Sequence, residues 1–388
     1  MSTIINTRSP YYFKVHNSSL HTAKLQLYIW TGETSDKDLN TDLRYTISKE
    51  EIGTNNYVVF ELSQLIRDYM ETEYNDYATD ALWIDATVTI YDSAGDVVQV
   101  GGQNTTTTQF LALDGYGYFE DGINPRSTEF TTPMVLQDNT TVFYYDGQDI
   151  KIPVYAEAET ITVTLQSQGA ADINWEAADD FWETNDSTWG SGSIAISITD
   201  SGDTDQKIQY VIIEDTATLI DGDTVTFSSN SSSYPDDVVI TLKKVNECKF
   251  SPLNVIFYNK YGALQNLWFF KKSITNINIT SEKFKNNILD IENSGGTPSY
   301  ALSKHQEKKF MANGKESITM NTGFYPQSYN EVVRQKMLAE QVWVDDLSNV
   351  LPINLKSNSL QFKKSVNDKL ITYTVQFDYA FDKINNIL

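Results

Sequence analysis

Short runs of alternating apolar and polar residues, separated by turn residues, recur along the chain. The clearest run is LITYTVQFDYAFD, residues 370–382, where apolar side chains alternate with Thr372, Thr374, Gln376 and Asp378. A period of two places successive side chains on opposite faces of a β-strand. We therefore expect a mainly β protein, and in this segment one strand of about eleven residues whose polar face is open to pairing with another subunit.

The chain of 388 residues is long enough for two or three domains. Residues 1–127 predict an N-terminal β-sandwich, because the strand-like runs AKLQLYIWTG (23–32) and ALWIDATVTIYDSAG (81–95) each have one apolar face. Between them, FELSQLIRDYMETEY (60–74) has apolar residues at helical spacing and predicts one short helix.

Residues 128–247 consist of short strand-like runs separated by Gly, Asn, Asp and Ser, a pattern that predicts an immunoglobulin-like sandwich. Within them, residues 173–212 contain Trp175, Trp182 and Trp189, followed by SIAISI and IQYVII. This stretch resembles bacterial immunoglobulin-like modules of the BACON type, although it lacks the Asn and Arg usual between the last two strands. The resemblance implies a sandwich more than it implies a ligand.

Residues 248–388 contain both helix-like and strand-like patterns, and they predict an α+β domain that takes part in assembly. SYNEVVRQKMLAEQVW has Ser328 and Glu331 at the spacing of a capping box, followed by an apolar face. We expect a helix there, in front of the strand of residues 370–382. The fold class is thus mainly β, with multidomain β-sandwiches and a C-terminal α+β domain.

The sequence NVIFYNKYGALQNLWFFKKS, residues 254–273, predicts a β-hairpin whose bulky apolar residues lie on both faces. Such a hairpin suits a joint that packs on its own domain by one face and on a neighbouring subunit by the other. The alternative is that it is enclosed between domains of the same chain. The candidate interface residues are Tyr258, Tyr261, Trp268, Phe269, Phe270, Lys271, Lys272, Tyr373 and Phe377.

Charge is unevenly divided along the chain. Residues 1–247 hold 12 Lys and Arg against 40 Asp and Glu, whereas residues 248–388 hold 17 against 12. An acidic front repels phosphate, so we expect no direct binding of nucleic acid. The asymmetry fits complementary surfaces in an assembly, or simply a surface that keeps the protein soluble.

Motifs for catalysis are not found in the sequence. The chain has three histidines and one cysteine, too few and too scattered for a zinc site or a Cys-His pair, and it has no nucleophile elbow or phosphate-binding loop. We expect no enzyme activity, no metal and no cofactor. Two open alternatives are calcium binding by the acidic runs 200–205 and 221–223, and glycan contact by Trp175, Trp182 and Trp189.

Three stretches together carry a family resemblance: SPYYFKV with AKLQLYIWTGE, NKYGALQNLWFF, and the C-terminal ESITMNTGFYPQSYNEVVRQKMLAEQVW with LITYTVQFDYAFDKINNIL. The set resembles structural proteins of tailed phages of Bacteroidota, including crAss-like phages. It implies a virion component of the tail or neck, part of a ring, hub or adaptor, without catalytic residues.

That resemblance further implies a homo-oligomeric ring, other tail or neck proteins as partners, and assembly in the host cytoplasm. The sequence contains no leader peptide and no apolar run near 18 residues, so we expect no membrane span. The competing functions are a receptor- or glycan-binding tail module and, less favoured, a hydrolase.

Overall fold

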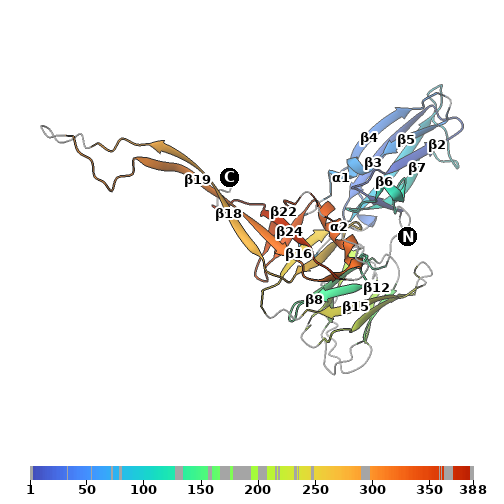
Figure 1. The fold of residues 1–388 in the computed structure, drawn as a ribbon. Coiled ribbons are helices and arrows are strands. Elements are labelled where there is room, and N and C mark those ends of the chain that lie inside the picture. Colours follow the sequence, from blue (N-terminus) through green and yellow to red (C-terminus); the bar gives the residue numbers. More distant parts are fainter. Residues whose placement is uncertain are drawn as a thin grey trace.

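The structure is a computed structural model of the chain. It describes residues 3–384 except 33, 54, 71–72, 78–80, 127–133, 156–159, 167–174, 178–193, 200–207, 215, 217–218, 231–233, 235, 246–248, 290–297, 358, 360 and 362–369. The described residues form a mainly β protein with several sheets, as predicted, and each sheet draws its strands from one of the three predicted segments. Figure 1 shows these parts as two lobes beside a central sheet with a long projection.

The N-terminal segment folds as two sheets with one short helix. A five-stranded sheet has the order β1-β7-β6-β3-β4, and β2 pairs with β5 beside it. The apolar residues of β3 alternate as predicted, with Leu25 and Leu27 fully buried in the same core as Ile66 of the helix. The elements are β1 (Thr3–Asn6), β2 (Tyr12–His16), β3 (Thr22–Trp30), η1 (Thr34–Asp36), β4 (Leu43–Glu50), β5 (Tyr57–Glu61), α1 (Ser63–Arg67), β6 (Leu82–Tyr91), β7 (Thr106–Leu113) and η2 (Phe119–Asp121).

The middle segment is a two-sheet sandwich. One sheet has the order β12-β10-β14-β15-β8 and the other β11-β13-β9, and apolar residues of both sheets share one core. Ile152 and Val163, from opposite sheets, are both fully buried in that core. The strands are β8 (Thr141–Tyr144), β9 (Ile150–Tyr155), β10 (Thr160–Gln166), β11 (Trp175–Ala177), β12 (Ile194–Thr199), β13 (Ile208–Ile213), β14 (Thr224–Ser229) and β15 (Val238–Lys244).

The C-terminal segment is built on a seven-stranded sheet of order β17-β16-β21-β22-β24-β19-β18. The helix α2 covers it through Val332 and Val333, which are buried in the same core as the sheet. The elements are β16 (Leu253–Tyr258), β17 (Leu264–Phe269), β18 (Ile274–Lys285), β19 (Glu307–Asn321), β20 (Tyr325–Pro326), η6 (Gln327–Tyr329), α2 (Asn330–Leu338), β21 (Val342–Asp345), β22 (Val350–Leu355), β23 (Leu370–Ile371) and β24 (Thr374–Tyr379).

The long C-terminal strand is shorter than the alternation predicts. The segment is divided into β23, which pairs with β20, and β24, which pairs with β22 and β19 on its two sides. The division falls at Tyr373, where the Thr322 hydroxyl accepts a hydrogen bond from the Tyr373 amide at 3.0 Å. Because both edges of β24 are paired within the chain, the expectation that this strand pairs with another subunit is wrong.

The predicted helix is present, but its capping box is not. The short helix η6 precedes α2, Tyr329 occupies the N-cap position, and no side chain caps the first turn. The Glu331 carboxylate instead lies 2.8 Å from Arg334 and accepts a hydrogen bond from the Tyr118 hydroxyl at 2.6 Å. A contact with the N-terminal segment has therefore replaced the local cap.

Candidate assembly surface

The predicted interface residues are mostly inside the molecule. Tyr258, Trp268, Phe269, Phe270, Tyr373 and Phe377 are all 6% exposed or less. Tyr261 is half-buried, and only Lys271 and Lys272 are exposed. The apolar side chains chosen from the sequence are therefore enclosed by the chain itself.

Both faces of the β16–β17 hairpin are buried, each in a different core. Phe257 and Phe269 belong to the core shared with α2 and the C-terminal sheet. Ile256 and Tyr258, on the opposite face, pack in a second core with residues of the N-terminal and middle segments, including Leu111 and Tyr210. Alternate residues of β16 therefore pack in two different cores of the same chain. The assignment of these aromatic residues to contact with a neighbouring subunit is corrected accordingly: the hairpin is enclosed between parts of one chain.

The turn of this hairpin is held by Asn259, which is fully buried. Its side-chain oxygen accepts hydrogen bonds from the amides of Tyr261, at 2.9 Å, and Ala263, at 3.2 Å. Its side-chain nitrogen donates to the Leu136 carbonyl of the middle segment at 2.7 Å. One side chain therefore fixes the turn and ties it to a second domain, which is a typical use of Asn in turns.

Lys260, the next residue, joins all three segments. Its carbonyl accepts hydrogen bonds from the Tyr116 amide, at 2.9 Å, and from Arg126, at 3.0 Å. Its ammonium lies 2.8 Å from the Asp138 carboxylate and 3.9 Å from that of Glu331. This small, largely buried network fixes the relative positions of the domains.

Burial is the main electrostatic effect in this network. It raises the pKa of the Tyr261 hydroxyl well above its usual value, and the negative charge of Asp138 adds to the effect. Burial also lowers the pKa of the Arg126 guanidinium. Burial therefore favours the neutral form of both side chains.

Gly262 allows the turn to approach the N-terminal segment. Its φ is +80°, and an added Cβ would lie 3.0 Å from backbone atoms of Asp114. We expect Gly262→Ala to lower the free energy of unfolding by about 3 kcal/mol, through backbone strain and the clash together. Urea unfolding measures this. Gly147→Ala is the matched control, because Gly147 has φ +76° and open space around it, and it should cost about 1 kcal/mol. Equal losses would show that the approach to Asp114 is unimportant.

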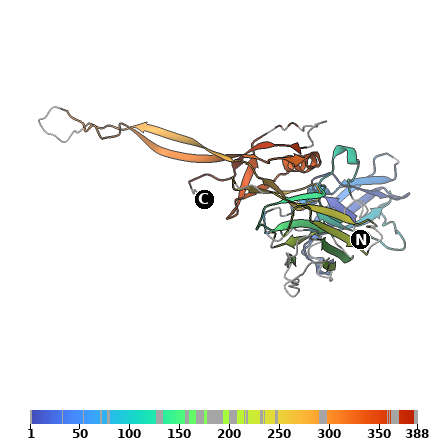
Figure 2. The same ribbon diagram turned by 60° about the horizontal axis from the view of Figure 1, so that its bottom comes forward.

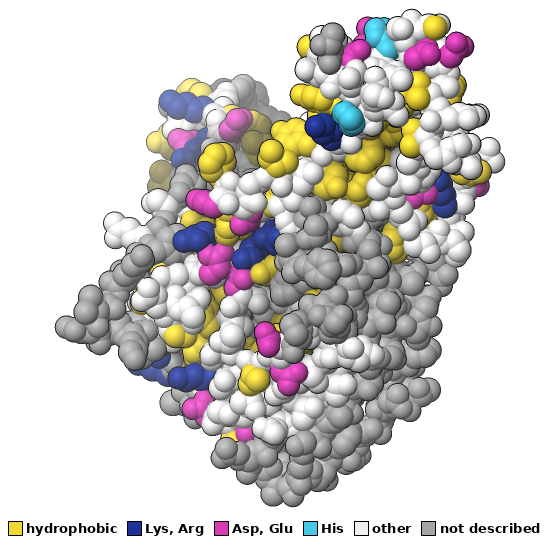
Figure 3. All heavy atoms as spheres, turned by 90° about the vertical axis from the view of Figure 1, so that its right-hand side faces the viewer, with side chains coloured by type: hydrophobic (Ala, Val, Ile, Leu, Met, Phe, Trp, Pro, Cys, Tyr) yellow, Lys and Arg dark blue, Asp and Glu magenta, His cyan; other side chains and the backbone are white. Residues whose placement is uncertain are grey.

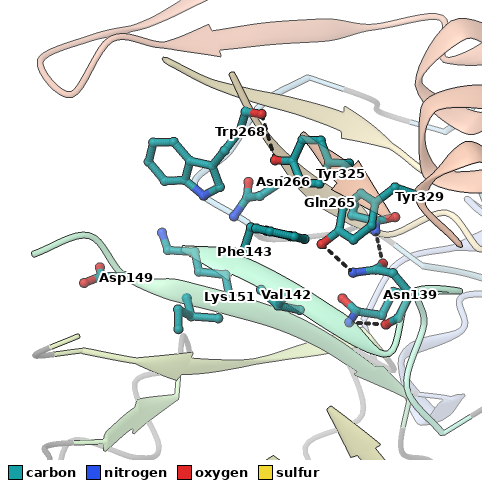
Figure 4. A pocket seen from close by; sticks show the side chains of 12 residues that line it. Asn139, Val142, Phe143, Asp149, Lys151, Gln265, Asn266, Trp268, Tyr325 and Tyr329 are labelled. Atoms are coloured by element: carbon teal, nitrogen blue, oxygen red, sulfur yellow. Dashed lines mark hydrogen bonds between the residues drawn. The ribbon is translucent and has the colours of Figure 1, made fainter. Parts of the chain in front are cut away.

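Figure 4 shows a crevice between β8 and the C-terminal sheet. Its polar groups are satisfied within the chain: Gln265 donates to the Asn139 side-chain oxygen at 2.7 Å, and the Tyr325 hydroxyl donates to the Trp268 carbonyl at 2.8 Å. The crevice has a volume of about 20 Å³, enough for about one water molecule. It is a seam between domains rather than a ligand site.

The largest exposed feature is a two-stranded projection that we call the arm. It consists of β18 and β19 with the described connecting residues 286–289 and 298–306. Strand β24 pairs with β19 only from Ser317 to Asn321, whereas β18 follows β19 out to Glu307. The pair therefore leaves the sheet, and both views show it extending far from the rest of the molecule (Figures 1 and 2).

The arm exposes large apolar side chains that lie outside the cores formed by the described residues. Ile277 is 50% exposed and Ile279 is 62% exposed, and these two residues share a face of β18 because they are two positions apart. Farther out, the rings of Phe284 and Phe310 contact each other at 6.5 Å between centroids, while both remain exposed. Residues 274–321, which contain the arm, hold six lysines against five Asp and Glu, so the arm has almost balanced charge. Exposed apolar side chains gathered on one element are typical of a binding surface.

Sequence reasoning did not predict the arm. The pattern was present in ITNINIT, residues 274–280, which alternates β-branched and polar residues. Such a run normally predicts a strand with one buried face. The pattern contains no information that both faces remain exposed, because that depends on where the neighbouring strands end.

Several other predicted sites lie wholly or partly outside the described residues. Trp182, Trp189 and residues 200–205 are not described, and Trp175 is placed only as part of β11, paired with Ile213. Within 221–223, Asp223 is buried and accepts a hydrogen bond from the Ile220 amide at 2.9 Å. Among the described residues, no group of three or more His, Cys, Asp or Glu is placed to hold a metal ion. No helix in the described part is long and apolar enough to cross a membrane.

Comparisons with known proteins add little. No protein-family model and no curated protein matches the chain. Among solved structures, CBD12 from CALX1.2 is 11% identical over 60% of this chain and 81% of its own, with a TM-score of 0.19. The calcium-binding domain CBD12 of CALX1.1 is 8% identical over 58% of this chain and 76% of its own, also with a TM-score of 0.19. Likenesses this weak carry no argument about ligands.

Proposed function

We propose that this chain is a non-catalytic structural component of a phage virion tail or neck, which assembles with copies of itself and with other tail proteins. The observation that carries the proposal is the arm. The strand pair leaves Ile277, Ile279 and Phe310 at least half exposed, so these side chains bury little apolar surface in one isolated chain. It suits a protein whose apolar projection is buried only when it is assembled.

The body of the molecule supports the same proposal. Its three segments are fastened together by the buried hairpin and by the Lys260 network, so that the arm is held on a rigid base. The Arg8 side chain adds a further link, donating to the Leu338 carbonyl of the C-terminal segment at 2.6 Å. A rigid body with a defined projection is what repeated, identical contacts in a ring or hub need.

The decisive experiment locates the protein in assembled particles. Phage particles purified from infected cells should carry the chain, and gold-labelled antibody against it should mark the tail or neck. The full chain, expressed alone, should also form oligomers that light scattering detects. Particles that lack the chain would contradict the proposed function.

Self-association of this protein should weaken as the salt concentration rises from about 0.05 M to about 0.5 M, because surface charges are weakly screened at the first concentration and strongly screened at the second. The reason is the uneven charge, with 12 Lys and Arg against 40 Asp and Glu in residues 1–247 and 17 against 12 in residues 248–388. Exposed charge pairs are screened within about 8 Å at 0.15 M salt. Sedimentation velocity at the two salt concentrations measures the effect. An oligomer that is unchanged or stronger at high salt would remove charge from the explanation.

A further inference from the structure

A small group of charged side chains joins the N-terminal segment to the C-terminal segment. Arg8, which follows β1, donates through Nη2 to the Leu338 carbonyl at 2.6 Å, and its Nε lies 3.6 Å from the Glu340 carboxylate. Arg67, the last residue of α1, also forms an ion pair with Glu340. Together with Asp114, whose carboxyl feels these charges, they form what we call the Arg8 cluster. Figure 3 shows the N-terminal segment as the upper lobe, with charged side chains of both signs grouped below it.

Asp114, directly after β7, is the buried carboxyl of this cluster. It is 8% exposed, and its carboxylate accepts a hydrogen bond from the Thr7 hydroxyl at 3.4 Å. Among the described residues, the two arginines of the cluster pair with Glu340 rather than with Asp114. The hairpin turn approaches Asp114 through Gly262, which carries no charge. Burial of a carboxylate without a paired cation is costly, and the carboxyl avoids this cost by binding a proton.

Arg8 has hydrogen-bonding capacity that the C-terminal segment does not use. Its side chain is 9% exposed, and within the described part of the chain its Nε and Nη1 atoms have no hydrogen-bond acceptor. The guanidinium lies 4.6 Å from the centre of the Tyr116 ring, two residues along the chain from Asp114. An ionised Asp114 therefore competes with Glu340 and the Leu338 carbonyl for this guanidinium, whereas a protonated Asp114 leaves it to them.

We propose that Asp114 is a pH-sensitive group that sets how tightly Arg8 holds the N-terminal segment to the C-terminal segment. The contact is tighter when the carboxyl is protonated and looser when it is ionised, because the ionised form draws Arg8 away from Glu340. The apolar core that the segments share keeps them together in both states, so the change is a local opening rather than a separation. This behaviour belongs to the single chain and does not depend on assembly.

The direction of the pH dependence follows from burial. Burial raises the pKa of Asp114 from 3.8 to about 6, and the negative charge of Glu340 adds to this effect. The positive charges of Arg8 and Arg67 and the hydrogen bond from Thr7 act in the opposite direction without cancelling it. Between the two pKa values the folded chain holds a proton that the unfolded chain has released. The stability that Asp114 contributes is therefore full below pH 3.8 and is lost as the pH rises through about 6.

Urea unfolding of the wild type and Asp114→Asn at about pH 5 and about pH 7.5 tests the titration. Asparagine keeps the shape of the side chain and still accepts a hydrogen bond from Thr7, but it cannot ionise. We expect the unfolding equilibrium constant of the wild type, relative to that of the variant, to rise about tenfold between the two pH values, because Asp114 is mostly protonated at the lower one and ionised at the higher one. Asp96→Asn is the matched control, because Asp96 is exposed, and it should show no such rise.

Hydrogen exchange tests whether the effect lies at the contact between the segments. The Tyr116 amide donates across this contact to the Lys260 carbonyl at 2.9 Å. The Thr322 amide donates to the Tyr373 carbonyl at 2.9 Å within the C-terminal segment and is the internal reference. After correction for the intrinsic exchange rate, protection of the Tyr116 amide relative to that of Thr322 should fall by up to about tenfold over the same pH range in the wild type. In Asp114→Asn it should stay constant.

Two results would overturn this role of Asp114. A ratio of unfolding constants that does not change with pH would show that the carboxyl does not titrate in this range. A ratio that rises while the relative protection of the Tyr116 amide stays constant would place the effect in the whole fold rather than at the contact. If Asp114→Asn does not fold, exchange in the wild type at the two pH values still decides whether the contact loosens.

Discussion

Replacing Lys336 with methionine is expected to raise the free energy of unfolding by up to about 5 kcal/mol at pH 7. Lys336 lies in the last turn of α2 and is fully buried. Its ammonium contacts the Met337 sulfur at 3.5 Å and lies 4.9 Å from the centre of the Phe377 ring. Among the described residues, no carboxylate forms an ion pair with it. Burial of a charge without a partner is costly, and an apolar side chain of similar shape removes that cost.

The pH dependence of this gain has a definite sign. Burial lowers the pKa of Lys336 from 10.5 to about 7 in the folded protein. Between these two values the unfolded chain binds a proton that the folded chain does not, so wild-type stability rises with pH. Below the folded value both states bind the proton and the cost is constant. The advantage of Lys336→Met should therefore be largest at pH 7 and shrink steadily towards pH 10.

Urea unfolding of both proteins at pH 7, 8 and 9, from the folded pKa of Lys336 towards its unfolded pKa, measures this difference. Lys272→Met is the control, because Lys272 is exposed and its substitution should change stability by less than about 0.5 kcal/mol at any pH. A gain for Lys336→Met that is the same at every pH would show that desolvation of the ammonium is not its cause. A loss of stability would show that the side chain has a partner that methionine cannot replace.

Phe269→Ala is expected to lower the free energy of unfolding by about 4 kcal/mol. Phe269 is 1% exposed and packs edge-on against Phe377 at 6.3 Å between ring centroids, in the core shared by the hairpin, α2 and the C-terminal sheet. Removal of the ring leaves a cavity that the paired strands around it cannot close. Thermal and urea unfolding measure the loss.

A Phe-to-Ala substitution on the arm should have the opposite effect, with little change in stability and weaker self-association. Phe284 is 43% exposed, so Phe284→Ala should change the unfolding free energy by less than about 1 kcal/mol while weakening self-association. The two variants together distinguish a core residue from an assembly residue. If Phe269→Ala weakened assembly without loss of stability, the hairpin would face a neighbouring subunit, as the sequence alone had suggested.

The strands were largely predictable because each depends on a local pattern. The alternation of Leu25, Leu27 and Ile29 predicts one buried face, and all three are buried. The hairpin at residues 254–273 was predictable for the same reason, since two β-rich runs flank a turn that ends in a glycine with positive φ. The short helix and α2 were likewise indicated by helical spacing of apolar residues.

The partners of these strands were decided only by the tertiary structure. Periodicity shows that a face is apolar, but whether a domain of the same chain or another subunit covers it depends on contacts between residues far apart in sequence. Trp268 and Tyr258 are thus buried in the chain, while Ile277 and Ile279, with an ordinary strand pattern, are left exposed. The break at Tyr373 has a similar cause, because a hydrogen bond to Thr322, distant in sequence, outweighs the local alternation. By itself, the sequence determined that this protein is built of sheets and where the hairpin turns; the arm arose because β24 stops pairing with β19 at Ser317, a limit set by the packing of the whole sheet.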